Sequence, residues 1–133
     1  MRIVLEGQQF EVIDPYQERR PDSFCPTLRP LDGLGLLDRS VFGKRRPEER
    51  VMMYTLLMDD TPVDQTGVLT KNPPKYKKGA HLDITDKFFG PNYLISWRFA
   101  NGMAIASTPI LYGTSLEDLA ANGFLLANNK KQP

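Results

Sequence analysis

Alternating apolar and polar residues on both sides of an Asn-Gly pair form the clearest pattern in the chain. The pattern spans residues 92–111, with Asn101 and Gly102 at its centre. Because both central residues of a type I′ turn need positive φ, such a pair predicts a tight β-hairpin. Large rings then face small partners on one side of the hairpin, an arrangement typical of packing rather than of chemistry. The predicted partners are Ala100 with Met103, Phe99 with Ala104, Trp97 with Ala106, Ile95 with Thr108 and Tyr93 with Ile110.

Shorter patterns of the same kind predict further strands. Residues 1–15 alternate loosely on both sides of Gly7, which indicates two short strands joined by a turn. The apolar run 51–58 fits a fully buried strand; the proline and acids before it also fit a helix start, and we favour the strand. Residues 59–62 have turn chemistry, so residues 63–70 are expected to return as a partner strand.

Other stretches lack the pattern of any regular element. Residues 71–79 form a basic loop with prolines, and residues 83–91 form a second irregular stretch. Between residues 14 and 46 the prolines fix φ and remove backbone donors, while several leucines still offer apolar contacts. This segment predicts an extended Pro/Gly-rich arm that packs on a neighbouring surface, and residues 127–133 predict a polar C-terminal tail.

One short helix is predicted after residue 113. Thr114 and Glu117 have the spacing of a capping box, in which each side chain satisfies a backbone amide at the helix start. The pair Asn122-Gly123 is typical of a helix end. Phe124 follows the glycine and is placed to contact Leu119, as in a Schellman motif.

Together these elements predict one mainly β (α+β) domain over residues 1–133. The expected architecture is a small antiparallel sheet or barrel-like meander with one short C-terminal helix and the extended arm. A length of 133 residues, with 41% hydrophobic and 25% charged residues, is enough for one hydrophobic core.

Net charge, the length of the apolar runs and the cysteine content indicate the cellular compartment of the protein. The formal net charge is +1, so no overall field would draw the protein to nucleic acid or to an anionic membrane. No apolar run approaches the roughly 20 residues that cross a bilayer, and the first residues lack the pattern of a signal peptide. With a single cysteine, these features predict the cytoplasm, or the host cytoplasm or a virion if the protein is viral.

Candidate catalytic and metal-binding groups are few. His81 is the only histidine, and with Asp83 and Asp86 it provides ligand types suited to zinc or manganese. We interpret these three as an exposed loop rather than a metal site, and we predict no cofactor. Cys25 lacks a neighbour that would activate it, so it is expected to be packed and inert. Without a second histidine to serve a nucleophile, the chain is not expected to be an enzyme.

Two binding functions stay open as alternatives. The loop 71–78 carries four lysines around Tyr76, so a small nucleic-acid-binding module could follow phosphates with the lysines and stack bases on the ring. A small protein inhibitor or regulator could use an adaptable apolar surface of methionines, namely Met52, Met53, Met58 and Met103.

The function we favour is that of a non-enzymatic structural or assembly protein, a subunit of a larger complex such as the shell, connector or decoration layer of a virus or phage particle. The arm over residues 14–46 suggests it, because such arms often gain order by lying across a neighbouring subunit. The partners would be further copies or neighbouring subunits, with nucleic acid not favoured and no membrane. The residues expected to make these contacts are Pro15, Arg19, Arg20, Pro21, Pro26, Leu28, Lys75, Tyr76, Lys77, Lys78, Lys130 and Lys131.

Overall fold

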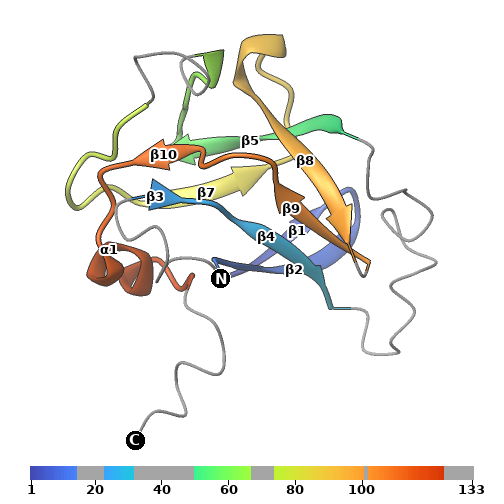
Figure 1. Cartoon of the computed structure of the whole chain (residues 1–133), viewed down its shortest axis with the longest axis horizontal. Coiled ribbons are helices and arrows are strands. Elements are labelled where there is room, and N and C mark those ends of the chain that lie inside the picture. The colour runs from blue at the N-terminus through green and yellow to red at the C-terminus, as the bar shows by residue number, and fades with distance from the viewer. Residues whose placement is uncertain (15–22, 32–49, 67–73, 101, 125–133) are drawn as a thin grey trace, which may run out of the picture.

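The computed structural model describes residues 1–14, 23–31, 50–66, 74–100 and 102–124. Figure 1 shows their strands curling around a common centre, with one short helix at an end of the sheet. The strands are β1 (Arg2–Leu5), β2 (Gln8–Ile13), β3 (Ser23–Phe24), β4 (Thr27–Pro30), β5 (Val51–Met58), β6 (Thr61–Pro62), β7 (Leu82–Thr85), β8 (Leu94–Ala100), β9 (Met103–Ala106) and β10 (Leu111–Tyr112). A 3-10 turn, η3 (Pro91–Tyr93), precedes β8, and helix α1 spans Leu116–Ala121.

Eight of these strands form one sheet in the order β1-β2-β4-β9-β8-β5-β6, with β7 also paired to β5. All of these pairs are antiparallel. Thr55 of β5 pairs with Leu94 of β8 and also with Thr85 of β7, so β8 and β7 flank β5 on opposite sides. The curled sheet is a half-barrel whose two edges are β1 and β7, which confirms the predicted mainly β fold with one short C-terminal helix.

The hairpin of β8 and β9 has the predicted register near its turn. Trp97 pairs with Ala106 and Phe99 with Ala104. Farther from the turn the prediction was wrong, because β9 ends at Ala106. Pro109 lacks a backbone donor, and the chain beyond it turns away from β8 so that β10 pairs with β3. Asn101 lies outside the described residues, and Gly102 has the expected positive φ of 74°.

Two more tight turns join neighbouring strands. Glu6 and Gly7 both have positive φ, at 51° and 81°, and connect β1 to β2 as predicted. Asp59 and Asp60 have φ of 52° and 65° and connect β5 to β6. The run 51–58 is a strand, as expected. The partner strand predicted over residues 63–70 was wrong where it is described, because residues 63–66 are not in a strand and β6 lies at Thr61–Pro62, within the predicted turn. Residues 67–70 lie outside the described part of the chain.

Two predictions need correction. Residues 83–91 are not irregular throughout, because β7 occupies Leu82–Thr85 and pairs along β5. The capping box of α1 uses Ser115 and Asp118, one residue later than predicted, and the Asp118 carboxylate accepts the Ser115 amide at 2.9 Å. That hydrogen bond holds the pKa of Asp118 below its usual value. The predicted end of the helix is confirmed, since the Phe124 amide donates to the Leu119 carbonyl at 2.9 Å.

The segment predicted as an arm contributes to the sheet where it is described. Its residues 23–31 contain β3 and β4, and β4 lies between β2 and β9 in the main sheet. Pro26 is buried and Leu28 is wholly buried, so this chain itself covers two of the residues expected to contact a neighbour. Pro15, Arg19, Arg20 and Pro21 lie outside the described residues, as does the stretch 32–49.

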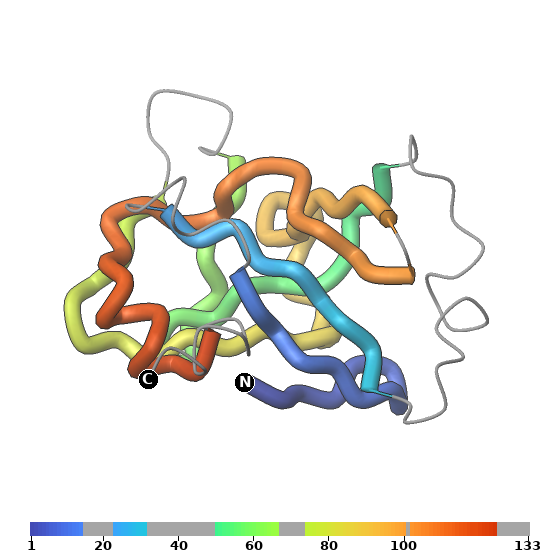
Figure 2. Tube along the Cα trace, turned by 60° about the horizontal axis from the view of Figure 1, so that its bottom comes forward, coloured from blue at the N-terminus to red at the C-terminus, as the bar shows by residue number. Residues whose placement is uncertain are grey.

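The core fills the inside of the half-barrel. Its largest fully buried side chains include Trp97, Phe10, Phe24 and Phe124. The rings of Phe24 and Phe124 lie 4.6 Å apart, which joins the two-stranded sheet to the turn after α1. Figure 2 shows this turn beside the N-terminal strand. In the described parts of the chain, no helix is long and apolar enough to cross a membrane.

Candidate binding cleft between β1 and β7

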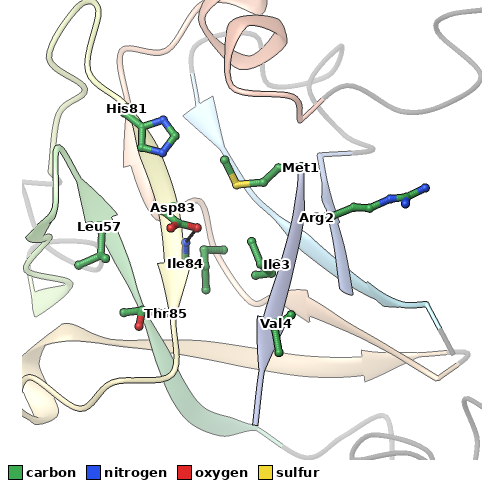
Figure 3. A pocket seen from close by; sticks show the side chains of 9 residues that line it. All are labelled: Met1, Arg2, Ile3, Val4, Leu57, His81, Asp83, Ile84 and Thr85. Carbon is green, nitrogen blue, oxygen red and sulfur yellow. Dashed lines mark hydrogen bonds between the residues drawn. The ribbon is translucent and has the colours of Figure 1, made fainter. Parts of the chain in front are cut away.

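A cleft of about 450 Å³ lies at the opening of the half-barrel, between the edges β1 and β7. One wall is formed by residues 1–4, and the other by His81, by residues 83–85 and by Leu57 of the adjoining β5. Figure 3 shows the side chains of Ile3 and Ile84 between the two strands. Among the described residues, no strand pairs with the outer edge of either β1 or β7.

The outer edge of β1 presents backbone donors and acceptors to this cleft. Hydrogen-bonded and non-hydrogen-bonded positions alternate along an antiparallel pair. The Val12 amide donates to the Met1 carbonyl at 2.7 Å, which fixes this alternation for β1 and β2. Arg2 and Val4 therefore direct their backbone N–H and C=O away from β2 and toward the cleft.

The edge of β7 follows the same rule. The Asp59 amide donates to the His81 carbonyl at 2.8 Å, so the positions bonded to β5 alternate from His81 onward. Leu82 and Ile84 therefore turn their backbone groups away from β5 and toward β1.

Side chains already occupy the two amides of this edge. The Leu82 amide donates to the Asn122 side-chain oxygen at 2.9 Å, and the Ile84 amide donates to its neighbour Asp83 at 2.8 Å. Such contacts limit unwanted strand pairing. β7 thus offers mainly carbonyl oxygens, whereas β1 offers both donors and acceptors.

The cleft is closed at both ends by contacts between distant parts of the chain. At one end the Met1 nitrogen donates to the Gly123 carbonyl, and the start of β7 meets Asn122 of the same turn. At the other end the Glu6 amide donates to the Asp86 carboxylate at 2.7 Å. β1 and β7 therefore run in the same direction on the two sides of the cleft, as Figure 3 shows.

A buried tyrosine strengthens the contact at the Glu6 end. The Tyr54 hydroxyl donates to the Glu6 carboxylate at 2.7 Å, and Tyr54 itself is only 5% exposed. Burial raises the pKa of the Tyr54 phenol, and the hydrogen bond to Glu6 and the nearby charge of Asp86 raise it further. Tyr54 sits at an irregularity of β5 with a φ of 66°, which is rare for a bulky residue.

The rim of the cleft carries exposed side chains, whereas its floor is formed by buried or partly buried aliphatic side chains. Ile84 is 3% exposed and Ile3 is partly buried against the core, so the floor is apolar. At the rim, Val4 is 62% exposed and is flanked on its own strand by the exposed Arg2. Asp83 stands on the opposite rim, where its carboxylate holds the Ile84 amide. This arrangement suits binding of a peptide backbone.

The three residues weighed as metal ligands do not converge. No group of three His, Cys, Asp or Glu side chains suited to a metal ion occurs within the described residues. The Asp83 and Asp86 carboxylates accept different backbone amides, those of Ile84 and Glu6. His81 is exposed at the cleft wall, where its amide donates to the Asp59 carboxylate at 2.9 Å.

The described part of the basic loop is bound to the rest of the protein. Lys78 forms an ion pair of 3.1 Å with Asp118 of α1. The Tyr76 hydroxyl donates to the Ala80 carbonyl at 2.7 Å, and its ring packs against the core, which leaves it poorly placed to stack on a base. Lys75 and Lys77 are exposed, and Lys130 and Lys131 lie outside the described residues.

Cys25 is a packed thiol, as expected. It is 3% exposed, and its sulfur lies 3.4 Å from the Ala106 carbonyl oxygen. A second hollow, of about 270 Å³, lies on the outer face of β5 and β8 beside Leu94 and Met52, which is 53% exposed. Of the described residues that line this hollow, Arg50 is the one that carries a charge.

Comparison of the chain with protein-family models, curated proteins and solved structures finds no match. The chemistry of the cleft is therefore inferred from this chain's own residues. The cleft was not predicted from the sequence, because residues 83–91 have the composition of an irregular stretch. The alternation of Leu82 and Ile84 with polar neighbours was the available signal for β7.

Proposed function

We propose that this protein is a non-enzymatic assembly subunit that binds an extended segment of a neighbouring subunit in a larger particle. The observation that carries the proposal is the edge of β1, whose backbone groups at Arg2 and Val4 face the cleft without a described strand to pair with. Shells, connectors and decoration layers of viruses and phages are particles of the expected kind.

Exposed strand edges are normally protected in proteins, because their free N–H and C=O groups can pair with another chain. β7 has such protection at Leu82 and Ile84, from side chains of Asn122 and Asp83. Among the residues that the structure describes, no side chain protects the outer edge of β1 in this way, and the apolar Val4 is 62% exposed on that strand. Strand addition to an edge is a common way of binding an extended segment, since main-chain hydrogen bonds supply affinity.

A proline at position 4 tests the proposal. Val4→Pro removes one donor facing the cleft and spares the β1–β2 pairing, because the Val4 amide points away from β2. Val4→Thr is the matched control, since it keeps the amide and the β-branched shape. The tagged full chain is produced in its native source, and the mass of the particle that contains it is measured by light scattering after size-exclusion chromatography.

The wild-type chain and Val4→Thr are expected in a particle far above the 15.1 kDa of one chain. Val4→Pro is expected to leave at least tenfold less chain in that particle. Fluorescence of Trp97, the single tryptophan, verifies that the variant is folded. A wild-type chain that migrates at 15.1 kDa in fresh extracts contradicts the proposal.

A further inference from the structure

We infer that the cleft accepts one isolated peptide strand, antiparallel to β1, with a β-branched, an apolar and an acidic residue in succession opposite Val4, Ile3 and Arg2. This inference rests on the proposed function and specifies the chemistry of its partner. The occupant is a free segment of a different protein, and a second copy of this chain is an alternative that the test distinguishes.

The shape of the opening favours a single strand over the edge of another sheet. β7 borders the cleft on the side opposite β1, so an incoming sheet would collide with it. β6 pairs with β5 on the same side as β8, so it adds no strand to the circumference of the half-barrel. The strands around that circumference are β1, β2, β4, β9, β8, β5 and β7. One added strand would bring this ring to eight, the number at which side chains just fill the interior of a barrel.

The closed ends limit the length of the occupant. The Met1 contact with Gly123 bounds one end, and the Glu6 contact with Asp86 bounds the other. β1 and β7 each have four residues between these contacts. A paired segment of about four or five residues fits this space, at a rise of roughly 3.3 Å per residue.

The backbone of β1 sets the register. Arg2 and Val4 each direct both a donor and an acceptor into the cleft, so one occupant residue can exchange two hydrogen bonds with each of them. The occupant residue between these two faces β7. Its amide has the carbonyls of Leu82 and Ile84 as acceptors, because the amides of that edge are held by side chains. The antiparallel direction is favoured because it is the more stable pairing per residue.

The side chains on the two faces of β1 then determine which residues the occupant needs at each position. The occupant residue opposite Ile3 points to the apolar floor beside Ile84, which favours an aliphatic side chain. The residue opposite Val4 lies on the outer face against an exposed β-branched side chain, where another β-branched residue packs well. The residue opposite Arg2 lies on the same outer face, and an acid there complements the guanidinium.

A synthetic peptide tests these three requirements. The probe is a fluorescein-labelled, end-blocked peptide with the core Val-Ile-Glu flanked by Ser, Thr and Lys, and binding to the purified full chain is measured by fluorescence anisotropy. The first control has the core reversed to Glu-Ile-Val, which keeps composition and charge. Two further peptides carry an N-methyl group on the core Val or on the core Ile, which removes the donor to β1 or to β7.

Saturable binding is expected for the Val-Ile-Glu peptide, with at least tenfold weaker binding for the reversed peptide and for each N-methyl peptide. Arg2→Glu is expected to weaken binding of the Val-Ile-Glu peptide and to strengthen binding of a Val-Ile-Lys peptide, because the charge at the rim of the cleft is inverted. Arg2 is exposed, but it pairs with Glu11 of β2, so the new carboxylate would face a like charge there. Trp97 fluorescence therefore verifies that this variant is folded before binding is compared.

Three results would overturn the inference. The first is equal binding of the forward and reversed peptides. The second is an N-methyl effect on the core Val alone, which would place the occupant on β1 outside the cleft. The third is a chain that dimerises and releases the peptide as its concentration rises, which would make a second copy the occupant. If the native particle still depends on the Val4 amide, the proposed function survives any of these results.

Discussion

Gly123 shows how one residue determines whether the end of the cleft can form. Its φ is +81°, and an added Cβ would lie 3.3 Å from the Met1 nitrogen that binds its carbonyl. Glycine is required here for two reasons, the backbone conformation and the close approach of β1. The pair Asn122-Gly123 predicted the positive φ, because such a pair is typical of a helix end. The contact of Gly123 with Met1, 122 positions away, has no local signal in the sequence.

Gly123→Ala is therefore expected to lower the free energy of unfolding by more than the roughly 1 kcal/mol that a positive φ costs alanine. Gly79→Ala is the matched control, because Gly79 has a φ of +85° and its added Cβ would meet nothing within 4 Å. Urea unfolding followed by Trp97 fluorescence gives both values. Equal losses for the two variants would show that the contact with Met1 adds nothing.

At the scale of elements, local chemistry predicted the turns better than the strands. The hairpin at 101–102, the turn at Gly7 and the helix end at Asn122-Gly123 depend on residues that adopt or favour particular dihedral angles. The helix start was predicted one residue early, because both Thr114 and Ser115 can cap a helix. The irregularity of β5 at Tyr54 was not foreseen, since the tyrosine is held there by Glu6, 48 residues away.

The bond between Tyr54 and Glu6 joins β5 to the β1–β2 turn, and its loss is expected to cost about 1 kcal/mol of unfolding free energy. Because the folded-state pKa of Tyr54 is raised, the fold favours the neutral phenol. The neutral Tyr54 phenol contributes its full stabilisation of the fold below the unfolded-state pKa of roughly 10, and this stabilisation declines as the pH rises above that value. Tyr54→Phe should therefore be less stable at pH 7 and lose less stability between pH 9 and 11.

The measurement is urea unfolding at a series of pH values for the wild type, Tyr54→Phe and the control Tyr112→Phe. Tyr112 is half-buried and lies on β10, away from the cleft. The account of this contact is wrong if Tyr54→Phe and the wild type lose stability in parallel above pH 9.

At the scale of the whole molecule, the order of strands was beyond local reasoning. β4 comes from a segment read as an arm, yet it pairs with β2 on one side and β9 on the other. Pro26, just before β4, and Pro30 suggested an arm, and the sheet accommodates Pro30 at the end of β4. The open edges of β1 and β7 follow only from this order, so the cleft could not be predicted from the sequence.

Both proposals require that the outer edge of β1 is open in the free protein and accepts a strand. Amide hydrogen exchange of the purified full chain, followed by NMR, tests it at single residues. In the free chain, the Val4 amide should exchange rapidly, while the Ile3 amide, which points to β2, should stay protected. Added Val-Ile-Glu peptide should slow exchange of the Val4 amide by at least tenfold and leave the exchange rate of the Ile3 amide unchanged. A Val4 amide that is protected in the free chain, or that exchanges at the same rate with saturating peptide, would contradict the claim.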